Sequence, residues 1–175
     1  MRKTVAILFS VLLLAACSIP QSSLATQIAP ANSQNCAYAW ATQPLPDLTS
    51  KVQSAFNAAG LQDIQASAQA YGENCIDPKT NKVLGFATME TDFHISKKMA
   101  DLTNREDLGG ALEKILIVLD ALPLGMIPGP QAGYINISFQ SGKDESNLSF
   151  TASAGKSARM LGLHGAELFE KLKQK

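Results

Sequence analysis

Two small groups of side chains in this sequence could carry chemistry. Ser153 and Lys156 are three residues apart, and on a helix this spacing places a lysine amine beside a serine hydroxyl that could act as a nucleophile. Asp92 and His94 are two residues apart, so on a strand they would share a face and could move protons to and from a substrate. Both groups permit the hypothesis of a small hydrolase.

The same residues also fit a surface that binds without reacting. The chain contains neither Ser-Asp-Asn nor Lys-Thr-Gly, the motifs that accompany Ser-x-x-Lys in penicillin-recognising enzymes. Glu90, Asp92 and His94 could gather a divalent cation, but they are also the alternate residues that a solvated strand face would carry. We therefore expect no catalytic residue, metal ligand or cofactor, and we favour a non-enzymatic binding or interaction module.

Periodic patterns predict the elements that position these residues. Apolar residues at helical spacing follow Asp47, a candidate N-cap, and end before Gly60, which favours a helix stop. Alternating polar and apolar residues cover 64–75 and 83–95, and residues 77–81 between them have the composition of a turn. This part of the chain is expected to be a helix followed by a long hairpin.

A second unit of the same kind follows. Thr103 and Glu106 have the spacing of a capping box ahead of an apolar helical stripe. Alternation over 134–140 and 148–153 predicts a second hairpin, and a helical tail covers about 157–173. The expected fold is α+β with the order αββαββα, an antiparallel four-stranded sheet and helices packed on one face.

The outward face of the two predicted hairpins is the candidate binding surface. Clean alternation is typical of a sheet with one face in water, so the outward polar residues are not needed for the core. Seven of them form the expected binding face: Gln69, Tyr71, Glu90, Asp92, His94, Asn136 and Ser138. Their partner would be an unknown envelope protein or a small ligand, and the remaining alternative is a structural spacer without a binding site.

The first 17 residues have the layout of an export signal. A basic start precedes an apolar run at 4–14, which is shorter than the roughly 20 residues that a membrane-crossing helix needs. Residues 14–17, Leu-Ala-Ala-Cys, resemble the lipobox of bacterial lipoproteins. The resemblance implies that Cys17 is lipidated and anchors the mature chain to a bilayer outside the cytoplasm, on the outer membrane if the host has one.

Composition divides the chain into three parts. Residues 1–16 are the expected signal peptide, and 17–46, which contain no Asp, Glu, Lys or Arg, are expected to be lipidated Cys17 and a flexible tether. Residues 47–175 are expected to form one α+β domain. Removing the two basic residues of the signal from the total of 15 leaves 13 against 15 acidic residues, so no attraction to nucleic acid is expected.

Two cysteines remain after Cys17. Cys36 and Cys75 are an even pair in a chain that is expected to be exported, which predicts a disulfide. A redox or metal pair is the alternative, although the spacing is not Cys-x-x-Cys and no His is close to either residue in the sequence.

Residues 48–56, LTSKVQSAF, and the order of elements resemble BON domains, which are small αββαββ modules of the cell envelope. The resemblance implies binding to a membrane or to a partner. It covers one short helix and the element order, and both the long connection at 96–107 and the additional C-terminal helix depart from it.

Overall fold

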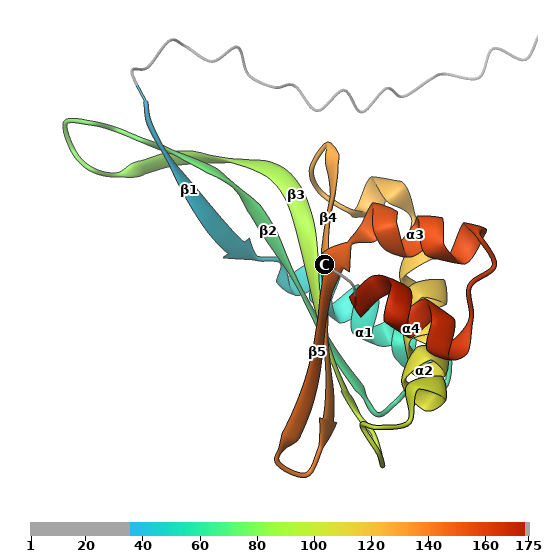
Figure 1. Ribbon diagram of the computed structural model, residues 1–175. Helices are drawn as coiled ribbons and strands as arrows, with labels where there is room; N and C mark the ends of the chain where they lie inside the picture. Colours follow the sequence, from blue (N-terminus) through green and yellow to red (C-terminus); the bar gives the residue numbers. More distant parts are fainter. Residues whose placement is uncertain (1–35, 174–175) are drawn as a thin grey trace, which may run out of the picture. The chain divides into compact units, whose positions relative to one another are not determined.

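The computed structural model describes residues 36–173, which form an α+β fold. The described elements are β1 (Ala37–Pro44), α1 (Pro46–Ala58), β2 (Ile64–Ile76), β3 (Val83–Lys98), α2 (Arg105–Asp120), the 3₁₀ turn η1 (Leu124–Met126), β4 (Gln131–Ser141), β5 (Asp144–Thr151), α3 (Ala152–Met160) and α4 (Gly165–Lys173) (Figure 1). The predicted α+β class is confirmed. The expected signal peptide and Cys17 lie outside the described residues.

The five strands of the described chain form one mixed sheet in the order β1-β2-β3-β4-β5. Neighbouring strands are antiparallel except β3 and β4, which are parallel. The predicted four-stranded antiparallel sheet is therefore wrong in both strand number and direction. The parallel pair arises because α2 crosses over the sheet between β3 and β4. Short hairpin turns join β2 to β3 and β4 to β5, whereas α1 lies between the antiparallel strands β1 and β2.

The additional strand, β1, is made of residues that the sequence analysis assigns to the tether. It pairs with β2 from Ala37 opposite Ile76 to Pro44 opposite Gln69. Seven of its eight residues are exposed, so β1 lacks the alternation that burial on one face imposes on a sequence. Pattern reasoning depends on that alternation and therefore missed the strand.

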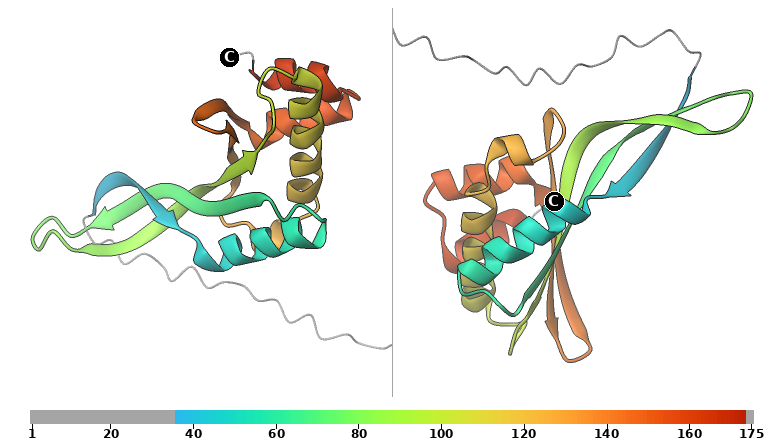
Figure 2. Two further views of the ribbon diagram at one scale, coloured as in Figure 1. Left: turned by 90° about the horizontal axis from the view of Figure 1, so that it is seen from below. Right: turned by 180° about the vertical axis from the view of Figure 1, so that it is seen from behind.

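The helices of the described chain all cover one face of the sheet, as the views in Figures 1 and 2 show. Their apolar sides meet the inward residues of β2 to β5 in one buried cluster, whose fully buried members include Phe56, Ile115, Ile137, Phe139 and Phe169. Removing this apolar surface from water is the main term that favours folding. The alternate strand residues point to the opposite face, which no described helix covers.

Two of the predicted helix starts are displaced. Asp47 lies in the first turn of α1, because Pro46 begins the helix at a position where a missing N–H costs nothing. Asn104, not Thr103, caps α2, and its side-chain oxygen accepts a hydrogen bond from the N–H of Glu106 at 3.1 Å. The predicted capping box is therefore replaced by an asparagine cap one residue later.

The backbones of α2 and α4 approach each other closely at Gly109. A Cβ atom added there would overlap the carbonyl oxygen of Gly165, the first residue of α4. Glu106 strengthens this contact, because its carboxylate accepts a hydrogen bond from the N–H of Ala166 at 3.0 Å. A side chain of α2 thus satisfies a free amide at the start of α4.

We predict opposite effects for alanine at the two adjacent glycines of α2. Gly109→Ala should lower the free energy of unfolding by at least about 2 kcal/mol, because the new methyl group meets backbone that cannot move aside. At Gly110 the added methyl group has open space around it, so Gly110→Ala should raise the free energy of unfolding by up to about 1 kcal/mol through helix propensity. Urea unfolding followed by circular dichroism measures both. Equal effects at the two positions would contradict the close approach of α2 and α4.

Candidate functional site

Polar side chains form two rows across the exposed face of the sheet. In the first row, backbone pairing sets Ser67 of β2 beside His94 of β3, His94 beside Asn136 of β4, and Asn136 beside Ser149 of β5. The second row lies two residues away along each strand and consists of Gln65, Ser96, Ser138 and Asn147. These two polar rows line a shallow, open depression of about 620 Å³.

The side chains of the two polar rows are hydrogen-bonding groups, and apolar residues complete the lining of the depression. Its described lining residues include no Asp, Glu, Lys or Arg. Serine hydroxyls and the Asn and Gln amides can each donate and accept hydrogen bonds. The surface is therefore suited to a ligand that carries closely spaced donors and acceptors and has no net charge.

Hydrogen bonds within the sheet hold these side chains in place. The amide nitrogen of Gln69 is hydrogen-bonded to Nε2 of His94. The hydroxyl of Ser149 donates to Oδ1 of Asn136 at 2.8 Å. Side chains that are already ordered lose less conformational entropy when a ligand arrives, which favours binding.

Only part of the predicted binding face lies at the depression. Three of its seven residues line the depression, namely His94, Asn136 and Ser138, and Gln69 contacts it through His94. The predicted binding face does not include the other five lining polar residues, which are Gln65, Ser67, Ser96, Asn147 and Ser149. They carry the same alternation signal, but choosing them requires knowing which segments of the four strands lie side by side.

Tyr71 belongs to a different part of the face. Its ring stacks on Trp40 of β1, with ring centroids 5.2 Å apart and ring planes 1° from parallel. Trp40 is 60% exposed, so the pair presents aromatic surface to solvent. The alternation pattern could not predict this contact, because Trp40 lies in β1, whose residues carry no such pattern.

Asp92 is bound to the backbone of the neighbouring strand. Its Oδ1 accepts a hydrogen bond from the N–H of Tyr134 at 2.7 Å, at a point where Gly133 lets β4 approach β3 closely. His94 has a separate partner in Gln69. The structure therefore does not pair Asp92 with His94 as an acid/base couple.

Ser153 and Lys156 lie in the first turns of α3. Thr151 caps this helix, and its hydroxyl accepts a hydrogen bond from the N–H of Ala154 at 3.2 Å. The same hydroxyl lies 3.0 Å from Oγ of Ser153. The serine hydroxyl is thus hydrogen-bonded to the cap residue, and Lys156 is exposed on the same helix.

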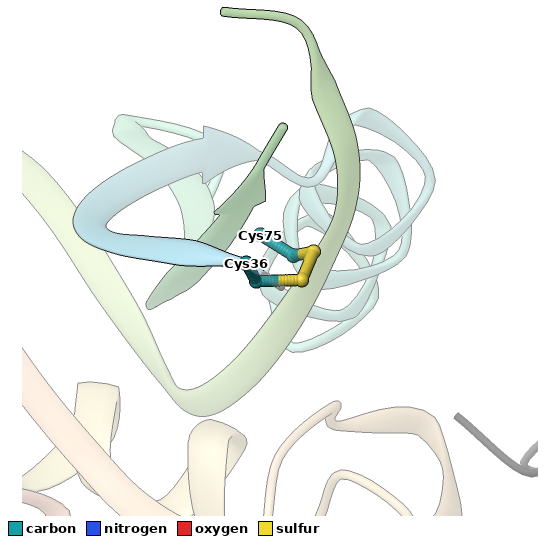
Figure 3. The surroundings of a disulfide bond; sticks show 2 residues. All are labelled: Cys36 and Cys75. Atoms are coloured by element: carbon teal, nitrogen blue, oxygen red, sulfur yellow. A yellow bond between two sulfur atoms is a disulfide. The ribbon is translucent and has the colours of Figure 1, made fainter. Parts of the chain in front are cut away.

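The predicted disulfide between Cys36 and Cys75 is confirmed (Figure 3). It joins the chain at the start of β1 to the end of β2, with Cα atoms 5.1 Å apart. The two residues are 39 positions apart in the sequence, and the chain-entropy model assigns about 4 kcal/mol to closing such a loop. The bond therefore fastens β1, which buries little surface of its own, to the sheet.

Two further features are absent from residues 36–173. These residues contain no group of three or more His, Cys, Asp or Glu side chains arranged to hold a metal ion. None of the helices they form combines the length and the apolar composition needed to cross a membrane.

Comparison with protein-family models, with curated proteins and with solved structures finds no match. None of these comparisons supports the resemblance to BON domains, which stays a prediction. Because no family model matches the chain, its function has to be inferred from its own surface.

We predict that Glu90 makes stability depend on pH. Burial raises the pKa of Glu90, and the Asp92 carboxylate raises that pKa further. A carboxyl group with a higher pKa in the folded state opposes folding once it is ionised. Glu90→Gln should therefore increase the free energy of unfolding at pH 7, and the increase should disappear as the pH falls below the ordinary glutamate pKa of about 4.3.

Urea unfolding over a series of pH values measures this difference. Glu167→Gln is the control, because Glu167 is an exposed residue in the first turn of α4, where a negative charge is favourable. That control should show no gain at pH 7. A Glu90→Gln difference that did not change with pH would contradict the assigned role of charge.

Proposed function

We propose that this protein is a non-enzymatic binding module of the bacterial cell envelope, anchored to a membrane through lipidated Cys17. The observation that carries the binding role is the depression across β2 to β5, lined by the two polar rows. No described helix covers this face, and the hydrogen bonds of His94 and Asn136 keep its central side chains ordered. The face is therefore accessible and preorganised.

The shape and polarity of the depression favour an extended ligand. Sites for small molecules are usually enclosed, whereas this hollow is open and carries two rows of polar side chains. Its chemistry suits an uncharged chain with regularly spaced hydroxyl or amide groups, such as a glycan strand or a peptide main chain. Ligand hydroxyls or amides would replace the water that now solvates the polar rows.

A hydrolytic function is not proposed, because no observation favours it. Ser153 is hydrogen-bonded to Thr151, and Asp92 and His94 have different partners. Ser153 instead contacts the cap residue of α3, and Asp92 links β3 to the backbone of β4. His94 is held in place within the polar rows by Gln69.

We predict that the polar rows contact the partner in cells. A photo-crosslinking amino acid placed at Ser149 should yield covalent adducts when the full chain is expressed in a bacterium and irradiated. The matched control is the same amino acid at Lys114, which is exposed on the helix-covered side of the sheet. Digestion of the adduct with a protease or with a glycan hydrolase, followed by mass spectrometry, identifies the ligand class.

The position dependence decides the outcome. Adducts at position 149 that are absent at 114 support a binding face on the sheet. Adducts in equal yield at both positions, or at neither, would contradict it. The substitution Asn136→Leu in the chain labelled at position 149 should reduce the yield, because it removes a central acceptor from the polar rows.

The proposed membrane anchor is inferred from the lipobox-like residues 14–17, and it can be tested separately from the binding face. The full-length chain is expressed in a bacterium, and mass spectrometry of the purified mature product should show an N-terminal Cys17 that carries diacylglycerol, since two acyl chains bind a bilayer firmly. Cys17→Ser should move the protein from the membrane fraction to the soluble fraction. An unmodified Cys17 in membrane-associated protein would rule out the anchor while leaving the binding face untested by that result.

A further inference from the structure

A second hollow lies on the helix-covered side of the sheet, away from the polar rows. It is a cleft of about 390 Å³ between the end of α2, the segment that follows it and the start of α3. Its floor is apolar and consists of Phe93, Leu119 and Ile135, each no more than 6% exposed. The cleft has the size and the apolar lining that are typical of ligand sites.

Leu124 forms one edge of this cleft and stands in water. Its side chain is 88% exposed, the highest value among the large apolar residues of the described chain. The segment that follows α2 and contains Leu124 is held to β3 by a hydrogen bond, in which the hydroxyl of Thr91 donates to the carbonyl oxygen of Pro128 at 2.6 Å. An apolar ligand in the cleft would therefore bury Leu124 without unfolding anything, and the gain increases with the apolar area removed from water.

The start of α3 adds one unbalanced positive charge to the lining of the cleft. Ser153 and Lys156 line it, and no described carboxylate forms an ion pair with Lys156. Asp120 also lines the cleft, but Arg159 pairs with it. An anionic group at the start of α3 would meet an ammonium group and a hydroxyl beside an apolar floor.

We infer that this cleft binds a fatty acid, with its acyl chain on the floor beneath Leu124 and its carboxylate at Lys156 and Ser153. The pairing of apolar walls with a single cation at the rim matches an amphiphile with a negative head group. The site lies on the other side of the sheet from the polar rows, so it does not depend on the function proposed above. It gives Ser153 and Lys156 a role in recognition.

Calorimetric titration with three ligands of similar chain length tests the inference on the full mature protein. Decanoate, decanol and decyltrimethylammonium, each used below its micelle concentration or solubility limit, have similar alkyl chains and differ in the charge and size of the head group. Decanoate should bind several-fold more tightly than decanol, and decanol more tightly than decyltrimethylammonium.

Two variants locate the site. Lys156→Gln should reduce the affinity for decanoate to that for decanol and leave decanol binding unchanged, while Lys143→Gln, in the turn between β4 and β5, should change neither. Leu124→Ser should weaken the binding of decanoate and decanol alike by several-fold. This substitution lies on an exposed side chain, so circular dichroism should show an unchanged fold.

Three results would overturn the inference. They are an absence of decanoate binding by the parent protein, equal affinity for all three head groups, and binding that neither Lys156→Gln nor Leu124→Ser alters. None of these results bears on the photo-crosslinking at the polar rows, so the two proposals succeed or fail independently.

Discussion

The parallel pairing of β3 with β4 is the contact on which the rest of the structure depends. It sets Ile95 beside Ile137 on the core side and His94 beside Asn136 on the exposed side. A single register therefore produces both a continuous core under the helices and continuous polar rows in water. Two separate hairpins would each be marginal in stability, and the crossover through α2 joins them into one sheet.

Local patterns in the sequence were sufficient for much of the fold. Alternation at Ile135, Ile137 and Phe139 predicts a strand with one buried face, and all three side chains are buried. The disulfide followed from the number of cysteines and the expected export. These features depend on residues near each other in the chain, or on chemistry that has few alternatives.

The missing parts depend on partners that are distant in the sequence. β1 is held by β2 and by the disulfide while burying little, so its own residues carry no periodic signal. In β3, Glu90 pairs with Tyr71 while Thr88 pairs with Gly72, which leaves an extra residue between them. This bulge turns Thr88 to the opposite face from Glu90, although strict alternation places both on one side. The binding face was therefore only partly predicted, because its membership depends on register.

The bond between Cys36 and Cys75 has a mechanical consequence. β1 is an edge strand with pairing on one side only, so tension applied to the chain ahead of it would break its hydrogen bonds one after another. The disulfide precedes the first hydrogen bonds between β1 and β2 along the chain, so it transmits the force directly to the end of β2. β2 has a hydrogen-bonded neighbour on each side, so the pulling force is spread over its hydrogen bonds to both β1 and β3. The hydrogen bonds of β1 are therefore not broken one at a time from the end of the strand.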